Sequence, residues 1–375
     1  MFFPLKFLQN HPVYRVHEIP ESFLRMSIDA TTFGSHLVPD WFQNGFEQSP
    51  KLRGKMQAVY DELSGHDRQY REAFYAAFLY DNEIQLLCDD VSLSPALKQP
   101  RFDSLHGCLH ALMTHLYTST LGTKSLVDAL GGADMLDHYR QFIQRNGDSY
   151  VCPFCGLSHF RDPSDGRRES YDHWLFKKYY PAAAVNFRNL VPMCAECNES
   201  PNKGENDILY GDRQRRTRRR ALFPYANCHG VDLVVSCVHP PSIVNLNGEW
   251  HVAVSARDES ETGQTDTWKS VFNIQSRLAH HIALHQRVWF TEFLIERDLA
   301  RATYDVTTVR SALSEHSDRL SLKLASHIQD GGFIKAAFFE FCTSNADDAV
   351  LMALGEIASS DVIRGRARMA EVAAG

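Results

Sequence analysis

The sequence lacks any unbroken run of about 18 apolar residues, the shortest stretch that indicates a membrane-spanning helix. The opening segment is interrupted by Pro4 and Lys6 before it reaches the length of a signal-peptide core. A G-x-x-x-x-G-K-[ST] loop is also missing, which excludes ATP hydrolysis at a P-loop. These absences predict a cytoplasmic protein that has no membrane partner.

The nine cysteines do not have the pattern of a disulfide framework. Their number is odd, and only four of them form close pairs with C-x-x-C spacing: Cys152 with Cys155, and Cys194 with Cys197. The other five are scattered along the chain. This usage is typical of metal binding rather than of disulfide bonding.

The charge is unevenly distributed along the chain. A net charge of -7 would by itself argue against a general binder of polyanions. Residues 151–220, however, hold 13 Lys and Arg against 9 Asp and Glu, and six arginines fall within 213–220. Basic charge is therefore concentrated around the paired cysteines, where it suits phosphate contacts. A solvated surface and an acidic partner protein are the alternatives for the arginines.

The pattern of apolar residues predicts an α+β protein in three parts. Residues 1–146 are expected to form an irregular arm of about 45 residues and then a helical domain, in which Met56, Val59, Tyr60 and Leu63 recur at helical spacing. Residues 147–225 are rich in Gly, Pro, Asn and Cys, as suits a small module held by metal.

Residues 226–375 are expected to be mostly helical after a short β-pair. Two β-branched segments around 231–238 and 250–254 predict the strands, with Asn247-Gly248 as the turn signal between them. Helices are predicted near 274–298, 307–329, 333–342 and 347–358, and the alanine-rich tail after residue 366 is expected to fray.

Four cysteines in two C-x-x-C pairs predict a structural zinc site. The pairs are separated by 38 residues, and each lies in a knuckle-like context, Cys-Pro-Phe-Cys-Gly and Cys-Ala-Glu-Cys-Asn. Four thiolates complete a tetrahedral zinc site with no position left for water. Such a closed site holds a fold together and does not catalyse a reaction.

Further polar residues occur in a fixed order between and after the two pairs. Asp172-His173 lies between them, Asn189-Leu190 follows, and the second pair continues into Asn198 and then Lys203-Gly204. Over about 70 residues this order resembles the HNH (ββα-metal) endonuclease family. The resemblance implies that residues 147–225 are a zinc-stapled module of two strands and a helix, which hold a divalent ion at their mouth.

The resemblance also implies a role for each polar residue. Asp172 would supply a carboxylate and Asn198 an amide oxygen to Mg²⁺ or Mn²⁺, which favour oxygen ligands. His173 would be the general base that takes a proton from the attacking water, a role worth roughly 10²–10⁴ in rate. Asn189 would tie together the loop after the first strand and orient His173.

Three positions depart from the family pattern. Asn198 stands where many members have a histidine, Phe176 stands where proline is usual, and Lys203 comes two residues later than expected. None of these changes removes a proposed catalytic atom. The residues expected to contact nucleic acid are Lys203, Arg215, Arg216 and Arg219.

The resemblance predicts a metal-dependent endonuclease that cuts nucleic acid, with DNA favoured. It also suggests a role in restriction or phage defence, together with a partner ATPase or regulatory protein. The alternative is a non-catalytic zinc-ribbon adaptor that binds nucleic acid or a partner protein. The surroundings of Asp172 distinguish the two functions. A solvent-open site shared with His173 and Asn198 favours the enzyme, and a carboxylate buried in an ion pair favours the adaptor.

Overall fold

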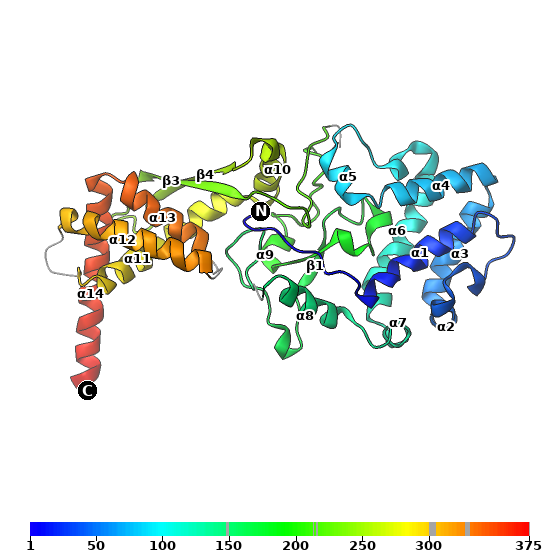
Figure 1. Cartoon of the computed structure of the whole chain (residues 1–375), viewed down its shortest axis with the longest axis horizontal. Coiled ribbons are helices and arrows are strands. Elements are labelled where there is room, and N and C mark those ends of the chain that lie inside the picture. Colours follow the sequence, from blue (N-terminus) through cyan, green and yellow to red (C-terminus); the bar gives the residue numbers. More distant parts are fainter. Residues whose placement is uncertain (148–149, 213, 215–216, 300–304, 327–330, 375) are drawn as a thin grey trace.

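The computed structural model describes residues 1–147, 150–212, 214, 217–299, 305–326 and 331–374. Within these ranges the chain forms an elongated α+β structure in which helices α1 to α7 lie at one end, α8 and the cysteine-rich segment lie in the middle and helices α11 to α14 lie at the other end (Figure 1). The predicted α+β class is therefore confirmed. No helix in the described ranges is long and apolar enough to cross a membrane.

The N-terminal end is built from helices that bury apolar stripes. The predicted stripe of Met56, Val59, Tyr60 and Leu63 is buried on α3, which packs against α6. The helices of this part are α1 (Glu18–Met26), α2 (Gln43–Glu47), α3 (Pro50–Ser64), α4 (Arg68–Tyr80), α5 (Ile84–Asp89), α6 (Asp103–Thr118), α7 (Lys124–Ala129) and α8 (Met135–Arg145). The helices expected in this part of the chain are thus present.

The first 45 residues are more regular than predicted. Helix α1 buries Ile19, Phe23 and Leu24 at helical spacing, but it has only nine residues and contains Pro20 in its first turn, so its one-sided pattern was missed. Residues before it do form an extended arm. The backbone N–H of Phe2 donates to the carbonyl of Pro153 at 3.0 Å, and the Phe2 ring packs on Trp268 and Phe333, so the arm joins the middle of the chain to its C-terminal end.

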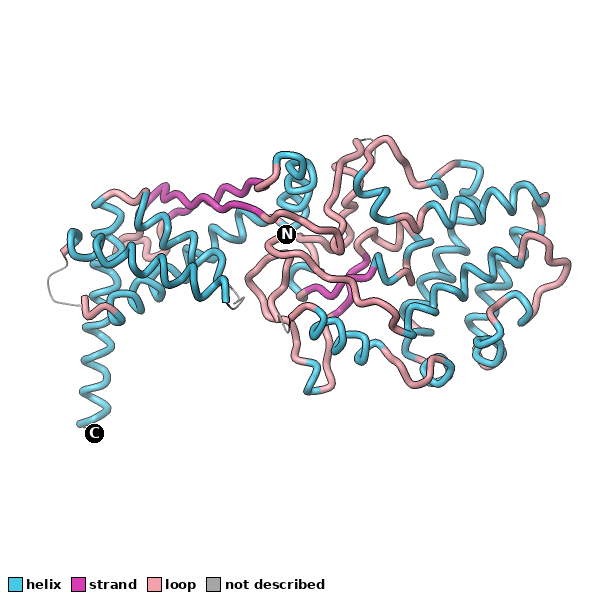
Figure 2. The backbone as a smooth tube through the Cα atoms, viewed as in Figure 1, coloured by secondary structure: helices cyan, strands magenta, loops and turns pink. Residues whose placement is uncertain are grey.

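The middle segment has two short antiparallel strands followed by a short helix. Strand β1 (Ser170–His173) pairs with β2 (Leu190–Met193), with Asp172 opposite Val191 and His173 opposite Leu190. Helix α9 (Ala195–Asn198) follows β2 directly. Loops make up most of the remainder of this segment (Figure 2).

The C-terminal end carries the predicted β-pair and five helices. Strands β3 (Val231–His239) and β4 (Glu249–Ala256) form a hairpin, in which Gly248 has a φ of 63° and a Cβ would lie 3.0 Å from the carbonyl oxygen of His239. The helices are α10 (Thr262–Phe272), α11 (Ile274–Glu296), α12 (Val306–Ser326), α13 (Gly332–Ser344) and α14 (Asp348–Ala374).

Helix α14 corrects one prediction. The tail after residue 366 was expected to fray, whereas the backbone stays helical to Ala374 and projects from the body (Figure 1). Alanine, arginine, methionine and glutamate dominate this stretch, and all four have high helix propensity. Local propensity is therefore sufficient to continue the helix where packing ends.

A buried polar chain fastens the N-terminal arm to β1. The Tyr14 hydroxyl donates to the carbonyl of Leu8, so its oxygen accepts from Nε2 of His138 at 2.9 Å. Nδ1 of His138 in turn accepts from the Tyr171 hydroxyl at 2.6 Å. The imidazole is therefore neutral. Burial, with a smaller contribution from His11, lowers the pKa of His138 to about 3.

We expect His138 to make stability depend on pH. Its folded pKa lies below its unfolded value, so its contribution is complete above about pH 6.5 and is lost as the pH falls from there towards 3. His138→Gln keeps a donor for Tyr14 but cannot be protonated. In urea titrations between pH 7.5 and 5, its free energy of unfolding should fall less steeply than that of the wild type, by up to about 1.4 kcal/mol per pH unit. Parallel slopes for the two proteins would contradict the assignment.

Candidate functional site

The four paired cysteines converge in the interior. All four are buried, and their Sγ atoms lie within 4.8 Å of one another. Sγ of Cys155 lies 3.8 Å from Sγ of Cys194, and a tetrahedral site with zinc–sulfur bonds of about 2.3 Å places its sulfurs about 3.8 Å apart. Burial raises the pKa of the Cys152 and Cys197 thiols, so four thiolates require a cation between them. The cluster can therefore bind a zinc ion.

Local sequence explains how each cysteine pair reaches the cluster. Gly156 ends the first pair with a φ of 66°, and its N–H closes a turn on the carbonyl of Cys152 at 2.8 Å. A Cβ at Gly156 would lie 3.2 Å from the Phe2 ring, so the arm seals this turn. Cys194 precedes α9, which carries Cys197 back to the same point.

Arg277 of α11 covers the cluster from the C-terminal end of the molecule. Its guanidinium donates to Sγ of Cys197 at 3.3 Å and lies 3.2 Å from a carboxylate oxygen of Glu196. A zinc ion with four thiolates carries a net charge of -2, so a nearby guanidinium lowers the electrostatic cost of burying it. Nothing in the sequence around Arg277 indicates this role, because it lies 80 residues after Cys197.

His173 is held in a single orientation at the end of β1. Its Nε2 lies 3.0 Å from the carbonyl oxygen of Ala184, and because a carbonyl only accepts, Nε2 carries the hydrogen. Nδ1 has no hydrogen-bond partner among the described residues, and the residue as a whole is 5% exposed. Burial, aided by the Lys177 ammonium, lowers the pKa of His173 to about 3. The ring is therefore a neutral imidazole with Nδ1 as its acceptor, which is the form of a general base, but a pKa this far below neutral makes it a weaker proton acceptor than an ordinary histidine.

Asp172 and Lys203 form a buried ion pair. Nζ of Lys203 lies 3.2 Å from Oδ2 of Asp172 and donates to the carbonyl of His173 at 3.1 Å. The side chain of Asp172 is 5% exposed and that of Lys203 is fully buried. Burial raises the pKa of the Asp172 carboxyl, and Lys203 acts in the opposite direction. Lys203, which we expected to contact nucleic acid, instead lies inside the module as the counter-ion of a predicted metal ligand.

Asn189 closes the loop between the two strands. Its Oδ1 accepts from the backbone N–H of Leu175 at 2.7 Å, and its Nδ2 donates to the carbonyls of Leu175 and Ala183 at 3.0 and 3.2 Å. Ala183 directly precedes the residue whose carbonyl holds His173. This is the position in which a residue that orients His173 is expected.

Asn198 is not brought into this group by any hydrogen bond between described side chains. It lies half-buried at the end of α9, and its backbone N–H donates to the carbonyl of Cys194 at 3.0 Å. The structure thus brings together Asp172, His173 and Asn189, with Lys203 beside them. Asn198 is bonded instead to the second cysteine pair, through the carbonyl of Cys194.

The arginines that the structure describes in the basic cluster bind the chain's own carbonyl groups. Arg218 donates to the carbonyls of Leu87, Asp90, Leu93 and Leu209, and Arg220 donates to those of Asp89 and Ser260. No helix forms over the described residues of 211–220. The predicted contacts Arg215 and Arg216 lie outside the described residues.

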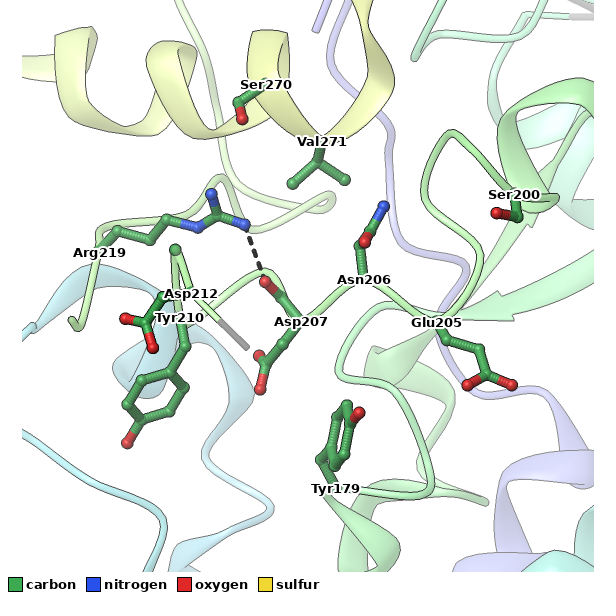
Figure 3. Close-up of a pocket in the computed structure, with 11 residues that line it drawn as sticks. Tyr179, Ser200, Glu205, Asn206, Asp207, Tyr210, Asp212, Arg219, Ser270 and Val271 are labelled. Carbon is green, nitrogen blue, oxygen red and sulfur yellow. Dashed lines mark hydrogen bonds between the residues drawn. The ribbon is translucent and has the colours of Figure 1, made fainter. Parts of the chain in front are cut away.

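Arg219, the remaining predicted phosphate contact, lines an acidic cavity. Its guanidinium donates to the carbonyls of Asp207 and Ile208, and it faces a cavity of about 620 Å³ that also carries Glu205, Asp207 and Asp212 (Figure 3). Carboxylates around a cavity repel phosphate. These surroundings do not suit the predicted contact between Arg219 and nucleic acid.

Comparison with known proteins provides no relative. No protein-family model matches the chain, and neither the curated proteins nor the solved structures contain a match. The candidate function therefore depends on the residues and their geometry.

We expect the purified protein to contain one zinc ion per chain, held by the four clustered cysteines. Cys194→Ser should lose the zinc and lower the melting temperature, because the bound ion stabilises the folded module. Cys108→Ser is the matched control, since Cys108 lies on α6 away from the cluster and donates only to the carbonyl of Leu105. Elemental analysis and thermal unfolding test this prediction. Equal zinc content in the two variants would overturn it.

We also expect Asp172 and Lys203 to be strongly coupled. Lys203→Met leaves a buried carboxylate without a counter-ion and should lower the free energy of unfolding by about 3–5 kcal/mol. Adding Asp172→Asn to Lys203→Met should recover part of this loss, because the uncompensated charge is removed as well. Urea unfolding of the single and double variants measures the coupling. Additive losses would show that the two side chains do not interact.

Proposed function

We propose that this protein is an HNH-type endonuclease that hydrolyses phosphodiester bonds in nucleic acid, with DNA as the favoured substrate. The observation that carries the proposal is the state of His173, a neutral imidazole whose Nε2–H is fixed by a backbone carbonyl and whose Nδ1 is left to accept a proton. The order of two strands and a helix around the cysteine cluster supports the same family resemblance.

In the proposed reaction His173 accepts a proton from the water that attacks the phosphorus atom. Asn189 fixes the loop that supplies the Ala184 carbonyl, so that the imidazole keeps its orientation and its tautomer. Asp172 and Asn198 would hold a Mg²⁺ or Mn²⁺ ion, which would stabilise the negative charge that develops on the phosphate. The zinc ion would have no part in the chemistry, because four thiolates leave it no open position.

The adaptor remains a second candidate because of the ion pair between Asp172 and Lys203. A carboxylate that already has an ammonium group 3.2 Å away is a weaker ligand for a divalent ion than a free one. In this function the module would bind nucleic acid or a partner without cutting. The buried ion pair is the outcome that favours the adaptor, whereas the fixed tautomer of His173 suits a general base. We place the enzyme first because of that tautomer and the order of the motif residues.

The test is nicking of supercoiled plasmid DNA with Mg²⁺ or Mn²⁺. We expect the wild type to nick DNA and His173→Ala to do so about 10²–10⁴-fold more slowly, since the general base is lost. His239→Ala is the matched control, because the side chain of His239 lies on β3 and is 72% exposed. Zinc content and circular dichroism establish that each variant is folded.

Two outcomes would contradict the enzyme. One is cutting that continues unchanged in His173→Ala, which would place the activity elsewhere or in a contaminant. The other is a wild type that binds DNA but cuts neither DNA nor RNA with any divalent ion, which would favour the adaptor.

A further inference from the structure

Two adjacent lysines lie in the turn that follows β1. Lys178 is exposed and Lys177 is partly buried. Within the described part of the chain neither of them forms an ion pair, whereas three other lysines each lie beside a carboxylate: Lys203, Lys269 and Lys335. Two ammonium groups without a paired carboxylate therefore lie next to the candidate active site.

Lys177 is connected to His173 through one aromatic ring. Its Nζ lies 5.4 Å from the centroid of the Tyr117 ring, and that ring meets the His173 imidazole edge-on at 4.3 Å. The Tyr117 hydroxyl donates to the carbonyl of Tyr171, which fixes the ring against β1. A phosphate held by Lys177 would thus be one ring away from the proposed general base.

A third lysine reaches the same surface from the N-terminal helical part. Lys98 ends a short 3₁₀ helix, Ala96–Lys98, and its Nζ lies 5.5 Å from the centroid of the Tyr179 ring. The pKa of His110 on α6 is lowered by burial and then by Lys177, Lys178 and Lys98, so all three ammonium groups act on one imidazole. Two separate segments therefore contribute to one basic surface.

We propose that Lys98, Lys177 and Lys178 form a basic ridge that binds the phosphate backbone of DNA and directs it to His173. The inference rests on the proposed function, which names nucleic acid as the substrate. Phosphates repeat along a strand and are bound by rows of cations, which position the strand without reading its sequence.

The surroundings of the basic ridge determine where the strand can lie. Burial lowers the pKa of Lys177, and the carboxylates of Asp172 and Glu205 act in the opposite direction. Tyr179 also lines the cavity that carries Glu205, Asp207 and Asp212 (Figure 3). The basic surface therefore changes to an acidic one at Tyr179. Because phosphate avoids the acidic side, the proposal places the DNA strand on the side of α6. The described arginines at 218–220 do not supply this charge, because they donate to backbone carbonyls.

The experiment measures DNA binding separately from cutting. Fluorescence anisotropy with a labelled duplex DNA is carried out in the His173→Ala background, with and without Lys98→Gln, Lys177→Gln and Lys178→Gln together. We expect the triple variant to bind at least about tenfold more weakly and the slope of log K against log salt to decrease by about 0.9 for each lysine that no longer neutralises a phosphate. The matched control is Lys6→Gln, Lys51→Gln and Lys124→Gln, an equal change of charge at exposed positions.

Each outcome decides the matter. Weaker binding by the triple variant but not by the control establishes the basic ridge, even if the wild type proves unable to cut. Equal binding by the two triple variants overturns the basic ridge, and so does a His173→Ala protein that does not bind DNA at all. If the wild type still nicks DNA in that case, the proposed nuclease function stands without the ridge. Because Lys177 packs on Tyr117, the single charge reversal Lys178→Glu at an exposed position repeats the test without touching that contact.

Discussion

Four sulfur atoms gathered in a dry interior impose the arrangement on which the rest of the molecule depends. Their approach brings the turn at Gly156 and the start of α9 to one point, from segments 38 residues apart in sequence. Other parts of the chain then close over them: Trp268 of α10 donates to the carbonyl of Phe154, and Arg277 of α11 donates to Cys197. Strands of four residues cannot bury a core of their own, so the cysteine cluster, which can bind a zinc ion, helps to give β1 and β2 a fixed position.

Local patterns predicted the elements whose formation depends on local physics. The apolar stripe of α3, the β-pair around Gly248 and the long helices of the C-terminal end follow from periodicity and turn chemistry, and all of them are present. Helix α1 was missed because it has only nine residues and includes a proline, Pro20. The continuation of α14 was missed because the alanine-rich tail was expected to fray, although its residues have high helix propensity.

The candidate site was predictable only in part, and the division has a physical cause. The cysteine cluster follows from two C-x-x-C pairs that the sequence displays directly, and the role of Asn189 was suggested by the family resemblance. Contacts between residues that are far apart in sequence do not show in any local pattern. Three examples join residues far apart in sequence: the bond from Arg277 to Cys197, the contact of Tyr117 with His173, and the bonds from Arg218 to its carbonyl partners. For the arginines, clustering in sequence suggested a shared surface, whereas those that the structure describes, Arg218, Arg219 and Arg220, donate to the chain's own carbonyl groups.

The same cysteine cluster also controls the electrostatics of the proposed active site. The backbone N–H of Lys203 donates to the carbonyl of Cys197, so the second knuckle places the lysine whose ammonium neutralises Asp172. A carboxylate this deeply buried needs a cation, and either an ammonium group or a divalent ion can provide the charge. The two compete for one position, because Nζ also bonds the carbonyl of His173 at the end of the same strand. In the proposed nuclease a divalent ion at Asp172 would have to replace the Lys203 ammonium as the counter-charge, whereas the proposed adaptor would keep the ion pair as it is.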